Sequence, residues 1–122
     1  MEIPKIFESE YRFACIVWEH EPIAMKELIK LCTAQLGWKR TTTYTVLKRL
    51  SERGIMQSVD SIVTSLISKE AIQRQESQEF INRTFEGSLP SFIAAFTSNK
   101  ALSSDEAAEI KKMIEEYEKE GK

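Results

Sequence analysis

The sequence predicts a mainly helical fold with one small β-hairpin, and three observations indicate it. Apolar residues recur at three- and four-residue spacing along most of the 122-residue chain, as they do on the buried side of helices. One stretch, "IMQSVDSIVTSLIS" (residues 55–68), is rich in β-branched residues and nearly uncharged, which is typical of strands. Three helical patterns precede it and three follow it. This order predicts an N-terminal winged helix-turn-helix domain (residues 1–72) and a C-terminal helical domain (residues 73–122).

Two helices are expected at the start of the chain. The first is capped by Ser9 and runs to about Glu19. Pro22 prevents it from continuing, because the residue before a proline is driven out of the helical conformation. The second covers about residues 24–36 and ends at Gly37.

The third helix and the hairpin follow directly. The helix is expected to start at a cap on Arg40 or Thr41 and to end at Gly54, since glycine readily takes the left-handed conformation that closes a helix. The apolar stretch after it is divided by Asp60-Ser61, a pair typical of hairpin turns. The sequence therefore predicts a short two-stranded wing.

Three more helices are expected after the hairpin. Ser68 caps a helix over about residues 69–85, a short apolar helix covers about 91–97, and Ser103 with Glu106 forms a capping box for the last one. Three amphipathic helices in about fifty residues are near the lower limit for a self-sufficient core. We therefore expect a homodimer through this region. The predicted dimer contacts are Ile72, Phe80, Ile81, Phe85, Phe92, Phe96, Ile110, Ile114 and Tyr117.

The charge is nearly balanced overall but unevenly distributed. The formal net charge is −2, and 42% hydrophobic with 30% charged residues is an ordinary globular composition. Residues 38–54, however, carry five basic residues and one acidic residue. A local excess of this kind is the electrostatic footprint of a nucleic-acid-binding helix.

The third helix divides into an apolar side and a polar, basic side. At about 100° per residue, Thr43, Leu47 and Leu50 group together and are expected to face the core. Hydroxyl side chains on the other side would let the helix approach a DNA groove closely, and Lys and Arg reach phosphates and base edges. The predicted DNA contacts are Lys39, Arg40, Thr41, Thr42, Tyr44, Thr45, Lys48, Arg49 and Arg53.

Two alternatives to DNA binding remain open at this point. The threonines could serve as capping residues and the basic residues as a solvated surface, although the position of this helix directly before a hairpin favours DNA. The other alternative is a winged-helix protein-interaction module, with the basic helix binding an acidic protein partner. The salt dependence of binding separates DNA from such a partner.

Catalytic, metal and cofactor sites are not expected. His20 is the only histidine, and a metal site needs several converging ligands. With one histidine no Ser-His-Asp set can be built, and the four glycines form no phosphate-binding loop. The sequence therefore predicts a protein that is not an enzyme and has no metal or cofactor.

A cytoplasmic location without membrane insertion is expected. No signal peptide opens the chain, and no apolar run approaches the ~20 residues that span a bilayer. Cys15 and Cys32 lie on apolar helical stripes, which favours a role as small buried hydrophobic residues. A disulfide or a redox role for the two cysteines is the alternative that the sequence leaves open.

Three stretches carry a resemblance to a known family. They are "GWKRTTTYTVLKRLSERGI" (37–55), "SQEFINRTFEGSLPSFIAAFT" (77–97) and "LSSDEAAEIKKMIEE" (102–116). In the first, Trp38, the threonine-rich helix start, Arg49 and Gly54 fall at the family's spacing. Over nearly its whole length the chain resembles the penicillinase-repressor (BlaI/MecI/CopY-type) winged-helix transcriptional regulators.

This resemblance implies a homodimeric repressor that binds a palindromic, double-stranded operator with one recognition helix per half-site. In the family, repression is commonly relieved when a membrane sensor-protease, triggered by a β-lactam, leads to cleavage of an Asn-Phe bond in the short penultimate helix. The aligned bond here is Ala95–Phe96, with alanine in place of the asparagine. The family's DNA contacts correspond to Lys39, Thr41, Thr42, Tyr44, Thr45 and Arg49.

Two departures from the family pattern change what we expect of the inducing signal and of the wing's contacts with DNA. No cysteine follows Cys32, whereas copper-responsive members end in a cysteine-rich tail, so copper sensing is not expected. The wing, residues 59–66, has no lysine, so its phosphate contacts should come from backbone and Ser/Thr groups. The regulated gene, the operator sequence, the inducing signal and the means of release, whether proteolysis, ligand binding or another, are left open.

Overall fold

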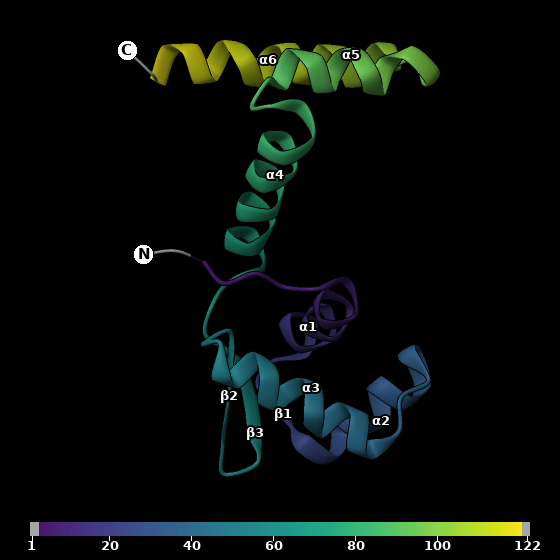
Figure 1. Cartoon of the computed structure of the whole chain (residues 1–122), viewed down its shortest axis with the longest axis vertical. Coiled ribbons are helices and arrows are strands. Elements are labelled where there is room, and N and C mark those ends of the chain that lie inside the picture. Colours follow the sequence, from purple (N-terminus) through teal and green to yellow (C-terminus); the bar gives the residue numbers. More distant parts are fainter. Residues whose placement is uncertain (1–2, 121–122) are drawn as a thin grey trace. The chain divides into compact units, whose positions relative to one another are not determined.

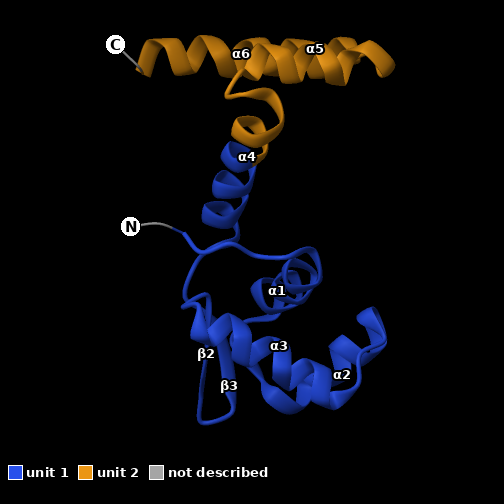
Figure 2. Cartoon of the chain, viewed as in Figure 1, with its two compact units in different colours: residues 1–79 blue, residues 80–122 orange. Residues whose placement is uncertain are grey.

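The structure, a computed structural model, describes residues 3–120 (Figure 1). The chain divides into two compact units, Met1–Glu79 and Phe80–Lys122, and helix α4 contributes to both (Figure 2). The elements in chain order are α1 (Glu8–His20), β1 (Ile23–Ala24), α2 (Met25–Leu36), α3 (Arg40–Glu52), β2 (Met56–Val59), β3 (Ile62–Ser65), α4 (Lys69–Phe85), α5 (Leu89–Asn99) and α6 (Ser104–Glu120).

The predicted mainly helical fold with a small wing is confirmed, and the structure adds one strand. β1 pairs antiparallel with β3, with Ile23 opposite Val63, so the sheet has three strands in the order β1-β3-β2. Sequence reasoning missed β1 because two residues are too few to show an alternating pattern. The two-residue turn at Asp60-Ser61 is confirmed, with φ of 51° and 63°, the signs of a type I′ hairpin turn.

Two of the predicted helix caps are wrong. The N-cap of α1 is Phe7, not Ser9, and its backbone N–H donates to the Glu10 carboxylate at 2.9 Å. The N-cap of α3 is Lys39, which satisfies no helix N–H with its side chain. Both predictions relied on the residue types that usually cap helices. In α1 the cap is instead stabilised by the Glu10 carboxylate, which accepts from the backbone N–H of Phe7.

The later caps are confirmed. Ser68 Oγ accepts from the N–H of Ala71 at 3.1 Å, and Ser103 Oγ accepts from the N–H of Glu106 at the same distance. Helix α5 begins two residues earlier than the predicted 91, because Ser88 caps it and Pro90 is well suited to a first helical turn.

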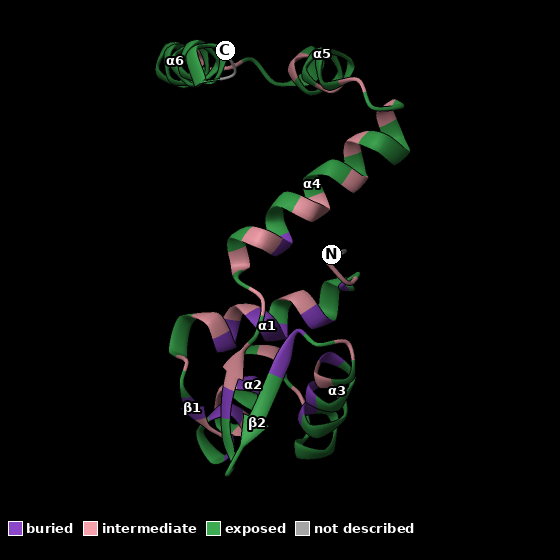
Figure 3. Cartoon of the chain, turned by 90° about the vertical axis from the view of Figure 1, so that its left-hand side faces the viewer, coloured by how far each residue is buried: buried purple, intermediate pink, exposed green. Residues whose placement is uncertain are grey.

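The core of the N-terminal unit lies between α1, α2, α3 and the inner face of the sheet, and its buried segments are distinct in Figure 3. Phe13, Leu28 and Leu50 are fully buried, and the Phe13 ring stacks on Trp38 with 5.9 Å between centroids. Ile72, which the sequence groups with the dimer contacts, is 1% exposed and belongs to this core. The first turn of α4 thus packs on the winged-helix domain, and Ile72 is not available to a second subunit.

The C-terminal unit is much less buried. Among its described residues, 80–120, none falls in the buried class, and α5 and α6 are mostly exposed in Figure 3. Its main internal contact is an aromatic cluster of edge-on and tilted rings, with neighbouring centroids 5.5 to 6.0 Å apart. The cluster consists of Phe80, Phe85, Phe92 and Phe96.

Candidate nucleic-acid interface

Helix α3 is oriented as its pattern predicts. Thr43, Val46, Leu47 and Leu50 are buried and fix one side of the helix against the core. Thr43 tolerates full burial because its hydroxyl donates to the Lys39 carbonyl at 3.5 Å. The packing of this side leaves the opposite side of α3 in solvent.

The exposed side of α3 carries hydroxyl and basic groups together. The Thr45 hydroxyl donates to the Thr41 carbonyl at 2.9 Å, a bond within the helix that favours one rotamer of this exposed side chain. Arg40 lies over the Tyr44 ring, with Cζ 5.7 Å from the centroid. Eight of the predicted DNA contacts are exposed on this helix or at its start: Lys39, Arg40, Thr41, Thr42, Tyr44, Thr45, Lys48 and Arg49.

Arg53, the ninth predicted contact, lies differently. Its guanidinium forms an ion pair with the buried Glu10 carboxylate and donates to the Lys5 carbonyl at 2.7 Å. It also lies over the Phe7 ring, 5.7 Å from the centroid. With these three partners the Arg53 side chain ties the end of α3 to the first turn of α1 and to the segment before it, and its guanidinium is engaged within the protein.

The pKa of Glu10 reflects this contact. Burial alone would raise it, but the hydrogen bonds from Arg53 and from the Phe7 N–H, with the positive charges of Arg53 and Arg49, lower it below its ordinary value of 4.5. Glu10 is therefore ionised at neutral pH and holds the end of α3 electrostatically.

The wing is attached to the helices at its tip. The Ser61 carbonyl in the hairpin turn accepts from the backbone N–H of Met25, at the start of α2, at 2.8 Å. On the solvent side of the hairpin, Val59 and Ile62 pair across the strands and are both exposed. Asp60 is the single charged residue in positions 55–68. Apart from Asp60 the wing therefore presents neutral side chains, and it carries no cation.

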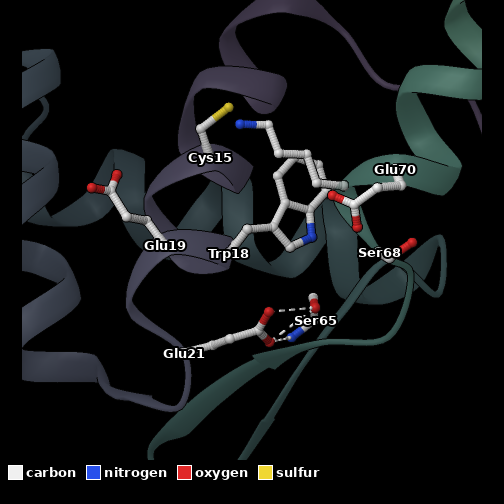
Figure 4. Close-up of a pocket in the computed structure, with 8 residues that line it drawn as sticks. Cys15, Trp18, Glu19, Glu21, Ser65, Ser68 and Glu70 are labelled. Carbon is white, nitrogen blue, oxygen red and sulfur yellow. Dashed lines mark hydrogen bonds between the residues drawn. The ribbon is translucent and has the colours of Figure 1, made fainter.

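A second feature of the N-terminal unit is a cavity of about 390 Å³ between the end of α1, the end of β3 and the start of α4 (Figure 4). In it the Glu21 carboxylate accepts from the backbone N–H and the hydroxyl of Ser65 at 2.7 and 2.9 Å. The Trp18 indole donates to the Ile67 carbonyl at 3.0 Å. These bonds join the end of α1 to β3 and to the segment between β3 and α4, so the cavity walls have a structural role.

The two cysteines are free thiols and do not form a disulfide. Cys32 is buried, as predicted, and burial raises the pKa of its thiol, an effect only partly offset by a hydrogen bond with Thr43. Cys15 is half-buried and lines the cavity of Figure 4 beside Trp18 and Glu19. Burial thus favours the un-ionised, unreactive thiol of Cys32.

No cluster of three or more His, Cys, Asp or Glu side chains that could hold a metal ion occurs within residues 3–120. Over the same residues, none of the helices is long and apolar enough to cross a bilayer.

The predicted dimer contacts of the C-terminal unit fall into two groups. Ile81, Phe85 and Phe92 are half-buried, and Phe85 and Phe92 pack against each other in the aromatic cluster. Phe80, Phe96, Ile110, Ile114 and Tyr117 are exposed, Tyr117 at 74%. Sequence reasoning missed Leu89, Ile93 and Met113, which are also exposed and extend the same apolar stripes at three- and four-residue spacing. Ala95 and Phe96, the bond aligned with the family's cleavage site, are both exposed on α5.

Known proteins share this sequence pattern along nearly the whole chain. The family model of the penicillinase repressor matches residues 6–116. The penicillinase repressor of Bacillus licheniformis is 28% identical over 120 residues, which cover 95% of this chain and 94% of that protein. The methicillin resistance regulatory protein MecI of Staphylococcus aureus is 25% identical over 114 residues, covering 90% and 93%.

A solved structure is similar as well. It is the solution structure of the monomeric form of BlaI from Bacillus licheniformis in complex with the blaP half-operator. The TM-score is 0.52 at 26% sequence identity, and the match covers 57% of this chain and 90% of that one. The relatives are regulators rather than enzymes. With the family model matched from residue 6 to residue 116, this chain belongs to the penicillinase-repressor family.

Proposed function

We propose that this chain is a homodimeric transcriptional repressor that binds a palindromic operator through the exposed side of α3. The observation that carries the proposal is the two-sided helix: one side is buried in the core, and the other gathers hydroxyl and basic groups, with Glu52 in the last turn as its one acidic residue. A relative of the same family has been solved on a half-operator, which supports DNA as the ligand of this surface.

The chemistry of α3 suits the major groove. The Thr41 and Thr42 side chains are short enough for the first turn to approach base edges, and threonine methyl groups can contact thymine. Arg49 is long enough for base edges or phosphates, and Lys39 stands at the helix start, where backbone N–H groups also attract phosphate. Arg40 and Lys48 add positive charge along the backbone of the DNA.

The C-terminal helices are proposed as the dimer interface, which gives residues 1–72 the role of DNA binding and residues 73–122 that of dimerisation. Exposed apolar side chains on both α5 and α6 support this role, since a stripe of that kind in a monomer is normally buried by a partner. Tyr117, Ile114 and Ile110 follow helical spacing along α6. A second copy supplies a matching stripe, as two-fold symmetry requires.

Release from DNA is proposed to follow an upstream signal. A membrane sensor-protease, as the family resemblance implies, would act on α5, and the exposure of Ala95 and Phe96 supports access to that helix. The alanine at this position means that the protease would have to accept a bond other than Asn-Phe.

Binding to the DNA upstream of the chain's own gene tests this function. Fluorescence anisotropy should show a tight complex that competitor DNA of unrelated sequence does not displace. In a plot of the logarithm of affinity against the logarithm of salt concentration, the slope should steepen by about one for each phosphate contact. If the ligand of α3 is an acidic protein rather than DNA, the assay should show no complex that depends on the DNA sequence. Such a result would favour the protein-interaction module.

A further inference from the structure

A groove of about 300 Å³ separates the outer edge of α3 from the wing. Met25 and Leu47 contribute apolar side chains to it. The polar lining consists of Tyr44, Lys48 and Ser51 from α3, and Ser58 and Ser61 from the hairpin. Two separate elements thus place polar groups around one small space.

The polar groups of this groove are all potential donors. Four hydroxyls and one ammonium line it, and no carboxylate does. Within residues 3–120, none of the four hydroxyls takes part in a side-chain hydrogen bond, and Lys48 is in no ion pair. Unpaired donors that converge on one space, with a single positive charge among them, match an anion with one negative charge and several acceptor oxygens.

The local structure holds these donors in place. Ser58 is paired with the buried Val63 across the ladder, so its side chain lies on the sheet face that is turned toward the helices. Ser61 is fixed by the bond from the Met25 N–H to its carbonyl. The buried Leu47 anchors α3 on the other wall, so the backbones of both walls are in place before an anion enters.

We infer that this groove seats one backbone phosphodiester of the operator in each half-site, with Lys48 as the cation and the Tyr44, Ser51, Ser58 and Ser61 hydroxyls as donors. The inference rests on the proposed function and deepens it. Tyr44 and Lys48 belong both to the groove and to the exposed side of α3, so a DNA strand on that helix passes the groove. A phosphate in this groove would also let the wing, which has no lysine, contact DNA through Ser58 and Ser61.

The test combines protein variants with DNA in which single phosphates are replaced by neutral methylphosphonates. Ser58→Ala and Ser61→Gly are combined, because glycine removes the hydroxyl and still accepts the φ of 63° at that position. The matched control is Thr64→Val, which removes a hydroxyl from the opposite face of the same hairpin. We expect the double variant to bind operator about tenfold more weakly than wild type and the control to bind unchanged.

The methylphosphonate scan identifies the phosphate. In wild type, one substitution per half-site should weaken binding, and the same substitution should have little further effect in the double variant, since both changes remove one interaction. Lys48→Gln should lower the salt slope by about one. Wild-type affinity together with an unchanged methylphosphonate pattern in the double variant would overturn the inference, while the binding role of α3 would stand.

Two further outcomes separate the remaining explanations. If wild type binds no operator, the proposed function and this inference fail together. If millimolar inorganic phosphate shifts the amide resonances of Ser58 and Ser61 but the double variant binds operator normally, the groove is a site for free anions and the DNA assignment is overturned.

Discussion

The guanidinium of Arg53, just after the last turn of α3, forms an ion pair with the buried carboxylate of Glu10 in the first turn of α1. The two residues are 43 positions apart, and their contact joins the chain start to the end of the proposed recognition helix. The Arg53 side chain keeps 28% of its surface exposed, so water partly screens the pair.

Arg53→Ala should therefore act on stability rather than on DNA contacts. Removing the cation leaves Glu10 buried without its partner, and we expect a loss of about 2 kcal/mol in the free energy of unfolding, less than the ~3–5 of a fully buried pair. Urea denaturation measures this loss. Arg74→Ala, which removes an exposed arginine of α4, is the control and should be neutral. Unchanged stability for Arg53→Ala would contradict the role given to the pair.

The same pair predicts a pH dependence. Because the folded state lowers the pKa of Glu10 below its ordinary 4.5, its contribution is complete above that value and is lost as pH falls through the lower, folded-state pKa. Glu10→Gln should make the unfolding free energy less dependent on pH in this acidic range. Thermal unfolding between pH 3 and 7 compares the two proteins, and parallel curves would argue against the assignment.

The hairpin turn predicts an increase in stability. Ser61 has a φ of 63°, which costs roughly 1–2 kcal/mol for a residue with a Cβ, while glycine brings an entropy cost of about 0.5–1. Ser61→Gly should therefore stabilise the protein by about 0.5 kcal/mol. Ser58→Gly, in the neighbouring strand, should have the opposite sign. If Ser61→Gly is destabilised as well, the left-handed backbone conformation of Ser61 does not carry the energetic cost assigned to it.

The exposed stripe of α6 predicts the oligomeric state. Ile114→Asp places a charge on that stripe and should give monomers that bind operator far more weakly, because each half-site then binds alone. Lys112→Glu changes the charge on the other side of the helix and should leave dimers intact. Sedimentation measures both variants, and a dimeric Ile114→Asp protein would rule out this part of α6 as the interface.

Base reading by α3 predicts the effect of Arg49→Ala. Loss of a base contact should cost about 1–3 kcal/mol of binding free energy and relax the preference at one operator position. A loss that is uniform across operator variants would instead assign Arg49 to a phosphate. Wild-type binding and preference in this variant would remove Arg49 from the interface.

Local patterns in the sequence were sufficient to predict the helices, the wing, and the buried and exposed sides of α3. Thr43, Leu47 and Leu50 recur at helical spacing, and their burial follows from that periodicity. The I′ turn was equally readable, since it depends on two adjacent residues. These features need no information about distant parts of the chain.

Features made by distant residues could not be read in the same way. The partner of Arg53 is far away in sequence, so the helical wheel of α3 placed this arginine among the DNA contacts. Ile72 fits an amphipathic stripe of α4 equally well whether it packs on its own chain or on a second one. The groove depends on how Ser58 and Ser61 face α3, which is a property of the packed unit.

The most direct test of the account is the affinity of the chain for its own upstream DNA, measured for wild type and Arg49→Ala at two or more salt concentrations. The account predicts a sequence-specific complex, a steep fall of affinity with salt, and a weaker, less selective complex for the variant. A complex that is absent, or that has the same affinity for unrelated DNA in both proteins, would contradict the proposal that α3 reads an operator.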